Sequence, residues 1–271
     1  TMEQMEALKQ SIREKGKMVV AFSGGVDSAY LAYCAKKYAQ NMLAIYYKSE
    51  FQPKFEFEDA KRFCAQHEIP LKILHGSVLN DNTIIENPKN RCYLCKHELF
   101  EKILKIAEEQ KIAYVAEGSN LDDNGDYRPG LKAVAELGIK SPLRDCGFTK
   151  QDIRVLSKAL NLPTWEKQSF ACLSSRFVYG ETISEEKLTM VDKAEQLLLD
   201  LGFHQVRVRI HGMMARIEIE PEEFSKLMEK ENRERIAKAF REYAFKEYGF
   251  TYVTMDLQGY RMGSMNETLE K

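Results

Sequence analysis

Short apolar runs alternate with amphipathic runs from residue 17 to about residue 160, and this alternation restricts the chain to few folds. Strands are expected at residues 18–22, 42–47, 71–74 and 112–116. Helices are expected at residues 27–38, 56–67, 93–110 and 150–160. Strands that alternate with helices run parallel and are covered by helices on both faces. The pattern therefore predicts an α/β domain built on a parallel sheet.

After about Gly180 the pattern changes and predicts a smaller α+β domain. The expected order is helix 183–201, strands 206–210 and 215–219, a long charged helix 221–248 and strand 252–257. We therefore expect a first domain of residues 1–165, a linker of residues 166–182 that carries Cys172, and a C-terminal domain of residues 183–271 for substrate binding or oligomerisation.

The hexapeptide Ser23-Gly24-Gly25-Val26-Asp27-Ser28 joins the first expected strand to the first expected helix. Two glycines let the backbone turn tightly, and the amides and partial positive charge of a helix N-terminus attract an anion. Ligands of such sheets also bind at the carboxyl ends of the strands. The alternative is a helix-capping turn without a ligand, which a Gly-Gly pair alone would favour. The full hexapeptide between a strand and a helix favours a phosphate site.

This hexapeptide resembles the PP-loop of the ATP pyrophosphatases, which cleave ATP between its α and β phosphates and transfer AMP to a substrate. The turn has neither the Gly-x-x-x-x-Gly-Lys-Ser/Thr nor the Gly-x-Gly-x-x-Gly pattern. We expect ATP to be bound by Ala21, Phe22, Ser23, Gly24, Gly25, Asp27, Ser28 and Gly118. Asp27 and Asp126 are candidate magnesium ligands, although acidic loops are usually just solvated.

Composition and charge limit the classes of function. Hydrophobic residues make up 44% and charged residues 30% of the chain, as in ordinary globular proteins. A net charge of −1 argues against a wide nucleic-acid surface but allows a local basic pocket. No apolar run approaches the ~20 residues that span a bilayer, and charged residues interrupt the first turns, so no signal peptide is expected. We expect a cytoplasmic protein without a membrane partner.

Six cysteines are present, and a reducing cytosol argues against a disulfide framework. Cys34 and Cys64 fall in amphipathic runs and are expected in the core, and Cys146 is assigned a structural role. Cys92 and Cys95 form a Cys-x-x-Cys just before an expected helix, whose N-terminus would stabilise thiolates.

Three interpretations of Cys92, Cys95 and the distant Cys172 are open. The thiols are unliganded, or they bind zinc with a fourth ligand such as His97, or they hold a [4Fe–4S] cluster with one open iron that can bind sulfide. A lone Cys-x-x-Cys gives the first interpretation about even odds, and no second Cys-x-x-Cys supports zinc. We favour the cluster because sulfur delivery complements an ATP-cleaving loop. Transfer of AMP makes a carboxylate oxygen a good leaving group, which a sulfur nucleophile can displace.

Motifs over nearly the whole chain resemble the LarE family, ATP-dependent sulfurtransferases that help make the nickel-pincer nucleotide of lactate racemase. The motifs are residues 21–28, 126–133, 174–177, 206–209, 215–218 and 256–261. They are specific together, whereas any single one after the first is weak. The resemblance implies adenylylation and then thiolation of the carboxylates of pyridinium-3,5-dicarboxylate mononucleotide. It also suggests a homo-oligomer, namely a hexamer.

Members of this family differ in their sulfur source. Some sacrifice a single cysteine and leave dehydroalanine, whereas others, similar to this chain, have a Cys-x-x-Cys plus a distant cysteine and are thought to carry a cluster. Cys92, Cys95 and Cys172 place the chain in the second group and are the expected catalytic residues, with sulfide or another sulfur donor as partner. In the absence of a cluster, Cys172 is the cysteine expected to be sacrificed.

Arginines are the candidate ligands of the substrate phosphate. Arg207 and Arg209 share one face of an expected strand, which is either a solvated surface or a phosphate site, because arginine binds phosphate bidentately. The expected substrate-binding residues are Arg128, Ser175, Arg176, Arg207, Arg209, Arg216 and Arg261.

Three rival functions remain. A tRNA thiolase would combine a PP-loop with three cysteines, but the balanced charge and the lack of a basic arm count against it. An amidating ligase would have no use for the three cysteines. A nucleotide or iron–sulfur sensor would not turn ATP over.

Overall fold

The computed structural model describes residues 1–124, 129–168, 172–242 and 249–270. The chain forms two compact units. The first contains residues 1–49, 54–76 and 90–169, and the second contains residues 50–53, 77–89 and 170–271. The domain boundaries drawn from the sequence stay predictions.

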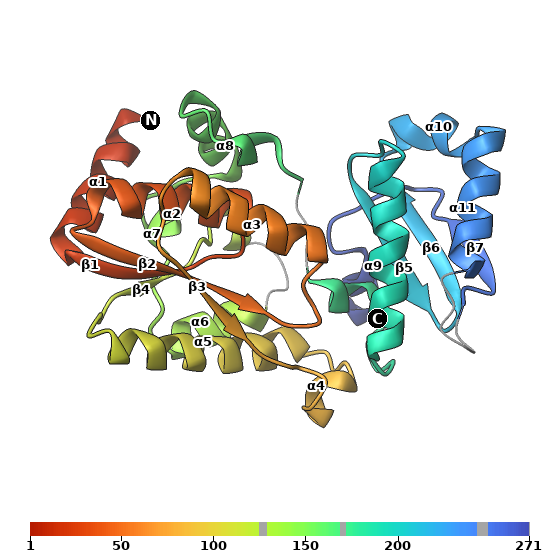
Figure 1. The fold of residues 1–271 in the computed structure, drawn as a ribbon, viewed down its shortest axis with the longest axis horizontal. Coiled ribbons are helices and arrows are strands. Elements are labelled where there is room, and N and C mark those ends of the chain that lie inside the picture. The colour runs from red at the N-terminus through yellow and green to blue at the C-terminus, as the bar shows by residue number, and fades with distance from the viewer. Residues whose placement is uncertain (125–128, 169–171, 243–248, 271) are drawn as a thin grey trace. The chain divides into compact units, whose positions relative to one another are not determined.

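A four-stranded parallel sheet forms the centre of the first unit (Figure 1). Its strands are β1 (Lys17–Ala21), β2 (Asn41–Lys48), β3 (Leu71–His75) and β4 (Val115–Ala116), in the order β3-β2-β1-β4. In the register, Val19 of β1 lies between Leu43 of β2 and Val115 of β4. The predicted parallel α/β architecture is confirmed, although β4 is shorter than the expected 112–116.

Helices cover both faces of this sheet (Figure 1). They are α1 (Met2–Lys15), α2 (Val26–Tyr38), α3 (Lys54–Gln66), α5 (Arg91–Glu109), α6 (Pro129–Glu136), α7 (Pro142–Asp145) and α8 (Lys150–Ala159). Val20 of β1 belongs to the core cluster that α1, α2, α3, α7 and α8 share. Its neighbour Val19 points to the opposite face and packs in the cluster of α5 and α6. Burial on both faces explains why the strands are continuous apolar runs.

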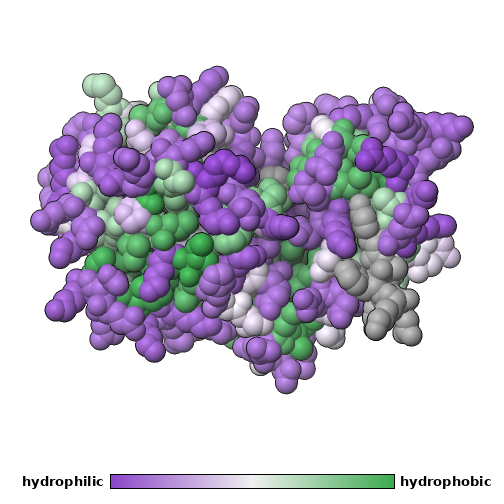
Figure 2. Space-filling model, viewed as in Figure 1, coloured by the Kyte–Doolittle hydropathy of each residue, from purple (hydrophilic) through white to green (hydrophobic). Residues whose placement is uncertain are grey.

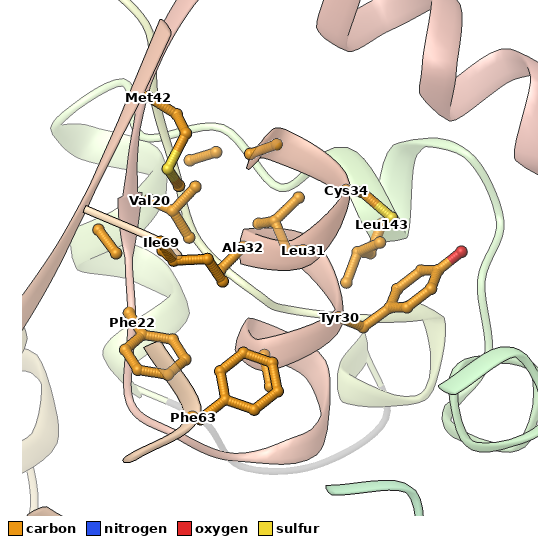
Figure 3. Packing of buried hydrophobic residues seen from close by; sticks show 14 of the residues in the cluster. Val20, Phe22, Tyr30, Leu31, Ala32, Cys34, Met42, Phe63, Ile69 and Leu143 are labelled. Atoms are coloured by element: carbon orange, nitrogen blue, oxygen red, sulfur yellow. The ribbon is translucent and has the colours of Figure 1, made fainter. Parts of the chain in front are cut away.

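Aromatic side chains support the carboxyl end of β1. Phe22 stacks on Phe63 of α3, with ring centroids 5.9 Å apart, and Leu31 of α2 belongs to the same core (Figure 3). Cys34 and Cys64 are buried in this cluster, as the sequence predicted. The segment that follows Phe22 therefore starts from a closely packed part of the core.

The second unit is an α+β structure, as expected. Its elements are α4 (Asn82–Ile85), α9 (Glu185–Asp200), β5 (Val206–His211), β6 (Met214–Ile219), α10 (Phe224–Met228), α11 (Lys230–Glu242) and β7 (Tyr252–Met255). The strand order is β5-β6-β7; β5 and β6 are antiparallel, and β6 and β7 are parallel. Apolar side chains of β5 and α9, among them Val208 and Leu198, are fully buried.

The prediction of one long helix over residues 221–248 is wrong. Residues 221–223 form a short 3₁₀ helix, and Glu229, with an extended ψ of 135°, separates α10 from α11. The side chain of Asn232 donates to the carbonyl of Lys226 at 2.8 Å, so it satisfies an acceptor that the break leaves open. The break places Leu227 and Phe240 in the interior from separate helices. Residues 243–248 lie outside the described residues.

The surface is mainly hydrophilic on the face drawn in Figure 2, where hydrophobic side chains form separate patches. None of the described helices combines the length and the apolar character needed to cross a bilayer.

Candidate active site

The loop between β1 and α2 presents the N-terminus of a helix at the carboxyl edge of the sheet. Gly25 occupies the N-cap position, and its lack of a side chain leaves α2 without a side-chain cap. The first-turn amides of α2 therefore remain directed toward the ligand side of the loop, where they suit a phosphate.

Two serines close this loop. The Oγ atoms of Ser23 and Ser28 lie 3.0 Å apart, and the Ser23 amide donates to Ser28 Oγ at 3.1 Å. The Gly25 amide donates to Ser23 Oγ at 3.4 Å. Ser28 is buried. These hydrogen bonds fix the conformation of the turn without a ligand.

Two glycines allow the backbone to pack tightly around the loop. Gly24 has φ +82°, and a Cβ there would lie 3.2 Å from the Cβ of Ala60 in α3. A Cβ on Gly118 would lie 2.9 Å from the backbone nitrogen of Ser28. Gly118 follows β4, so the chain after β4 lies directly against the first turn of α2, where the strand-end rule expects it.

Buried hydrogen bonds fix the turn at Gly118. The Glu117 carboxylate accepts from the Ser119 amide at 3.1 Å, from Ser119 Oγ at 2.7 Å and from the Ser141 hydroxyl. The carboxylate is buried and accepts twice from Ser119 of its own turn and once from Ser141, 24 residues further along the chain, so Glu117 acts as an anchor of the turn.

Asp27 has one satisfied and one unsatisfied carboxylate oxygen. Its Oδ2 accepts from Lys150 Nζ at 2.7 Å and from Asn120 Nδ2 at 3.2 Å. Its Oδ1 is buried and has no hydrogen-bond partner among the described residues. Burial raises the pKa of Asp27 above its ordinary value of 3.8, and Lys150 opposes that rise. An orphaned buried oxygen of this kind fits a cation ligand.

Other metal ligands are not brought together in the described ranges. No group of three or more His, Cys, Asp or Glu side chains there is placed to hold a metal ion. Asp126, the second expected magnesium ligand, and Arg128, an expected substrate ligand, lie outside the described residues.

Three residues beside the loop were missed from the sequence. Lys150, Asn120 and Lys167 all contact the loop or Asp27, and Lys167 Nζ donates to the Gly24 carbonyl at 3.1 Å. Lys150 begins a predicted helix after the last strand, so the strand-end rule could have found it. Lys167 lies 143 residues from Gly24, and no local signal marks it.

Cys92 and Cys95 lie within the first two turns of α5, which begins at Arg91 and not at residue 93 as expected. Both cysteines are half-buried, and their spacing places them on one side of the helix. The Arg91 guanidinium donates to Cys92 Sγ at 3.4 Å.

Cys172 belongs to the second unit, where it precedes a short 3₁₀ helix (Leu173–Arg176). It is half-buried, and its Sγ lies 2.6 Å from Ser174 Oγ. Because Cys92 and Cys95 belong to the first unit, a site that uses all three thiols stays a prediction.

The other three cysteines, Cys34, Cys64 and Cys146, lie in environments that make a thiol unreactive. Burial raises the pKa of Cys34 and of Cys64 to about 12. Burial and the neighbouring Asp145 also raise the pKa of Cys146. These three thiols therefore stay protonated at neutral pH.

Four of the expected substrate arginines of the second unit are paired with carboxylates, namely Arg176, Arg209, Arg216 and Arg261. Arg176 is fully buried and binds Glu195 through two hydrogen bonds of 2.7 and 2.8 Å. Arg209 binds Glu218 at 3.1 and 3.2 Å. The outer pairs are Arg216 with Glu218 and Asp256, and Arg261 with Asp256 and Glu267. This face of the sheet is therefore a charge network rather than a solvated arginine row.

Arg207 and Ser175 complete the network. Arg207 is 3% exposed, its guanidinium carbon lies 5.2 Å from the centre of the Tyr260 ring, and burial together with Arg176 lowers its pKa to about 10. Ser175 accepts from Arg176 through Oγ at 2.7 Å and from Arg209 through its carbonyl at 3.1 Å. The structure thus brings together five of the expected substrate residues, namely Ser175, Arg176, Arg207, Arg209 and Arg216.

The sequence matches known proteins over part or all of its length. Residues 17–92 match the family model of the queuosine biosynthesis protein QueC. The chain is 38% identical to an uncharacterized protein of Synechocystis sp., over 98% of each chain. It is 34% identical to pyridinium-3,5-bisthiocarboxylic acid mononucleotide synthase of Lactiplantibacillus plantarum, over 97% of this chain and 94% of that one. It is also 34% identical to an uncharacterized protein of Methanocaldococcus jannaschii, over 94% and 96%.

Proposed function

Because the chain belongs to the LarE family of ATP-dependent sulfurtransferases, we propose that it thiolates the carboxylates of pyridinium-3,5-dicarboxylate mononucleotide. The observation that carries this proposal is the nearly full-length similarity to a synthase of the corresponding bisthiocarboxylic acid, in a chain with the Ser23–Ser28 loop. Sulfur transfer to a precursor of the nickel-pincer nucleotide is the activity that this similarity supports.

The first step is adenylylation. A substrate carboxylate oxygen attacks the α-phosphorus of ATP, the bond to the bridging oxygen breaks, and pyrophosphate leaves with the electron pair. The amides of α2, together with Ser23 and Ser28, hold phosphate oxygens beside Gly24, Gly25 and Gly118. Asp27 Oδ1 is the oxygen that would hold a magnesium ion, whose charge would stabilise the leaving pyrophosphate.

The second step is displacement of AMP by sulfur. A sulfur nucleophile attacks the acyl carbon, the carbon–oxygen bond to AMP breaks, and AMP carries away the original carboxylate oxygen. The product is a thiocarboxylate. Cys92, Cys95 and Cys172 are the residues that we assign to sulfur delivery.

A [4Fe–4S] cluster is the cofactor that we propose for these thiols. The donors are of the type that such clusters use, because Cys92 and Cys95 are half-buried thiols on one side of α5. Cys92, Cys95 and Cys172 would hold the cluster, which would supply an iron able to carry sulfide for transfer. The alternative is that Cys172 itself donates its sulfur and becomes dehydroalanine.

The arginine network is our proposed site for the substrate phosphate. Arg207, Arg209 and Arg176 bring three positive charges together against the two buried carboxylates Glu195 and Glu218. A phosphate beside Arg207 would offset the burial and the repulsion from Arg176 that together lower the pKa of Arg207. Ser175, Arg216 and Arg261 surround this group and complete the proposal, with Arg128 from the undescribed part of the chain.

Three further statements are proposals from the family resemblance: a cytoplasmic location, an external sulfide or other sulfur donor, and a homohexamer. Sedimentation analysis of the purified protein tests the last of these. A monomer at micromolar concentration would contradict it.

Isotope transfer tests the adenylylation mechanism directly. The protein is purified without oxygen and incubated with ATP, sulfide and substrate whose carboxylates carry heavy oxygen. We expect AMP that contains one heavy oxygen for every sulfur gained by the substrate, measured by mass spectrometry. Cys146→Ser, outside the proposed site, is the matched control and should behave as the unaltered protein. AMP without heavy oxygen would overturn the mechanism.

A further inference from the structure

A half-buried lysine from the C-terminal end of the first unit contacts the Ser23–Ser28 loop. The side chain of Lys167 is 13% exposed, and its Nζ donates to the Gly24 carbonyl at 3.1 Å. Most lysine side chains are exposed, and those that are largely withdrawn from solvent usually have a charged partner. The position of this ammonium therefore calls for a ligand or partner that matches its charge.

The residues that contact Lys167 Nζ balance its positive charge only in part. In the described ranges, the ammonium donates one hydrogen bond, to Gly24, and its nearest carboxylate oxygen belongs to Asp59 at 3.9 Å. An ammonium can donate three hydrogen bonds, and 3.9 Å is too long for one. Donor capacity therefore remains on Lys167, at the turn that precedes the first amides of α2.

The backbone that carries Lys167 is fixed by α8. Arg154 of α8 donates from Nη1 to the carbonyl of Trp165 at 2.7 Å and to the carbonyl of Lys167 at 2.9 Å. Lys158 of the same helix lies over the Trp165 ring, 4.5 Å from its centre. Two backbone carbonyls and the Trp165 ring of this turn are therefore bound by side chains of α8. These contacts fix the position from which Lys167 reaches the loop.

We propose that Lys167 binds the phosphates that the Ser23–Ser28 loop holds, as a nucleotide-binding residue of the same site. This inference rests on the proposed ATP-dependent function. A pyrophosphate group in front of the α2 amides would accept hydrogen bonds from the donors of Lys167 that Gly24 does not use, and its negative charge would complement the ammonium. The lysine thereby contributes to binding of ATP and pyrophosphate and little to binding of AMP.

Calorimetric titration with magnesium pyrophosphate and with AMP tests this assignment. Lys167→Met should weaken pyrophosphate binding about tenfold or more, since it removes a charge-assisted hydrogen bond, and should change AMP binding less than about twofold. Lys36→Met, which changes an exposed lysine in the last turn of α2, should bind both ligands as the unaltered protein does. Equal pyrophosphate affinity in Lys167→Met and the unaltered protein would overturn the assignment.

A second measurement avoids any substitution that could prevent folding. The unaltered protein is treated briefly with an acetylating reagent, and the modification of Lys167 and Lys158 is quantified by mass spectrometry. We expect pyrophosphate to protect Lys167 and to leave Lys158 unchanged. Equal modification of Lys167 with and without bound pyrophosphate would refute the inference. Failure of the unaltered protein to bind ATP or pyrophosphate at all would refute the proposed function as well, so the two failures are distinguishable.

Discussion

The carboxylate of Asp27 lies in an unfavourable environment within the Ser23–Ser28 loop. Its Oδ1 is buried without a partner in the described part of the chain, and burial raises its pKa above 3.8 although Lys150 lies 2.7 Å away. Residues held in unfavourable environments often serve function rather than stability. The loop therefore carries a carboxylate that suits a ligand and lowers the stability of the protein when no ligand is bound.

Substitution of this carboxylate should separate stability from activity. We expect Asp27→Asn to raise the free energy of unfolding of the nucleotide-free protein by about 1 kcal/mol at neutral pH and to abolish release of pyrophosphate from ATP. The raised pKa means that Asp27 contributes stability below its unfolded pKa and loses it as the pH rises through the folded pKa. The gain in the variant should therefore vanish at acid pH in urea titrations. A less stable variant at neutral pH would refute this explanation.

The Arg176–Glu195 pair predicts a different pH dependence. Burial alone would raise the pKa of Glu195, but the Arg176 guanidinium lowers it below 4.5. The stability that Glu195 contributes is therefore complete above 4.5 and is lost as the pH falls through the lower folded value. We expect Glu195→Gln to cost about 3 kcal/mol at pH 7 and clearly less below the folded pKa, as urea denaturation at neutral and acid pH can measure. An equal loss at both would contradict the pairing.

At the scale of elements, the chain after β4 closely approaches the first turn of α2 beside the proposed nucleotide site. Gly118→Ala would place a Cβ 2.9 Å from the Ser28 nitrogen, which is backbone and cannot move cheaply. We expect a loss of about 1–3 kcal/mol in stability, measured by thermal denaturation. Gly25→Ala is the matched control for stability, because its φ is −72° and its Cβ would meet Ser23 Oγ only at 3.5 Å. Equal stability of both variants would contradict the packing.

Local signals in the sequence were sufficient for some elements. The first strand and the first helix were predicted within one residue of β1 and α2, because an apolar run, two glycines and an amphipathic run determine them locally. The break at Glu229 was missed because neither glycine nor proline marks it. The alternating pattern also predicted that Arg207 and Arg209 share a face, but not that this face is buried and paired.

Long-range packing decides the parts of the site that were missed. Lys167 reaches Gly24 over 143 residues, and Asn120 reaches Asp27 over 93 residues, so neither contact has a sequence pattern. The carboxylates that neutralise Arg176 and Arg209 come from α9 and β6, and only the folded unit brings them together.

At the scale of the whole molecule, the chain combines an ATP-cleaving loop in the first unit with thiols that belong to both units. The cluster hypothesis predicts that Cys92→Ala, Cys95→Ala and Cys172→Ala each lose most of the iron and acid-labile sulfide after purification without oxygen. The pKa of the Cys146 thiol is raised, so this thiol is protonated at neutral pH and is a poor iron ligand. Cys146→Ala should therefore keep the iron and sulfide content of the unaltered protein. Full iron content in Cys92→Ala would refute the cluster.

The central claim is that ATP cleavage drives sulfur into the substrate, and a single turnover tests it most directly. Protein purified without oxygen is mixed with ATP, sulfide and one equivalent of pyridinium-3,5-dicarboxylate mononucleotide, quenched over time, and analysed for AMP and for the thiolated product by mass spectrometry. We expect one AMP for each sulfur incorporated and an unchanged mass for the peptide that contains Cys172. AMP formed without any sulfur in the product, or sulfur incorporated without ATP, would contradict the claim.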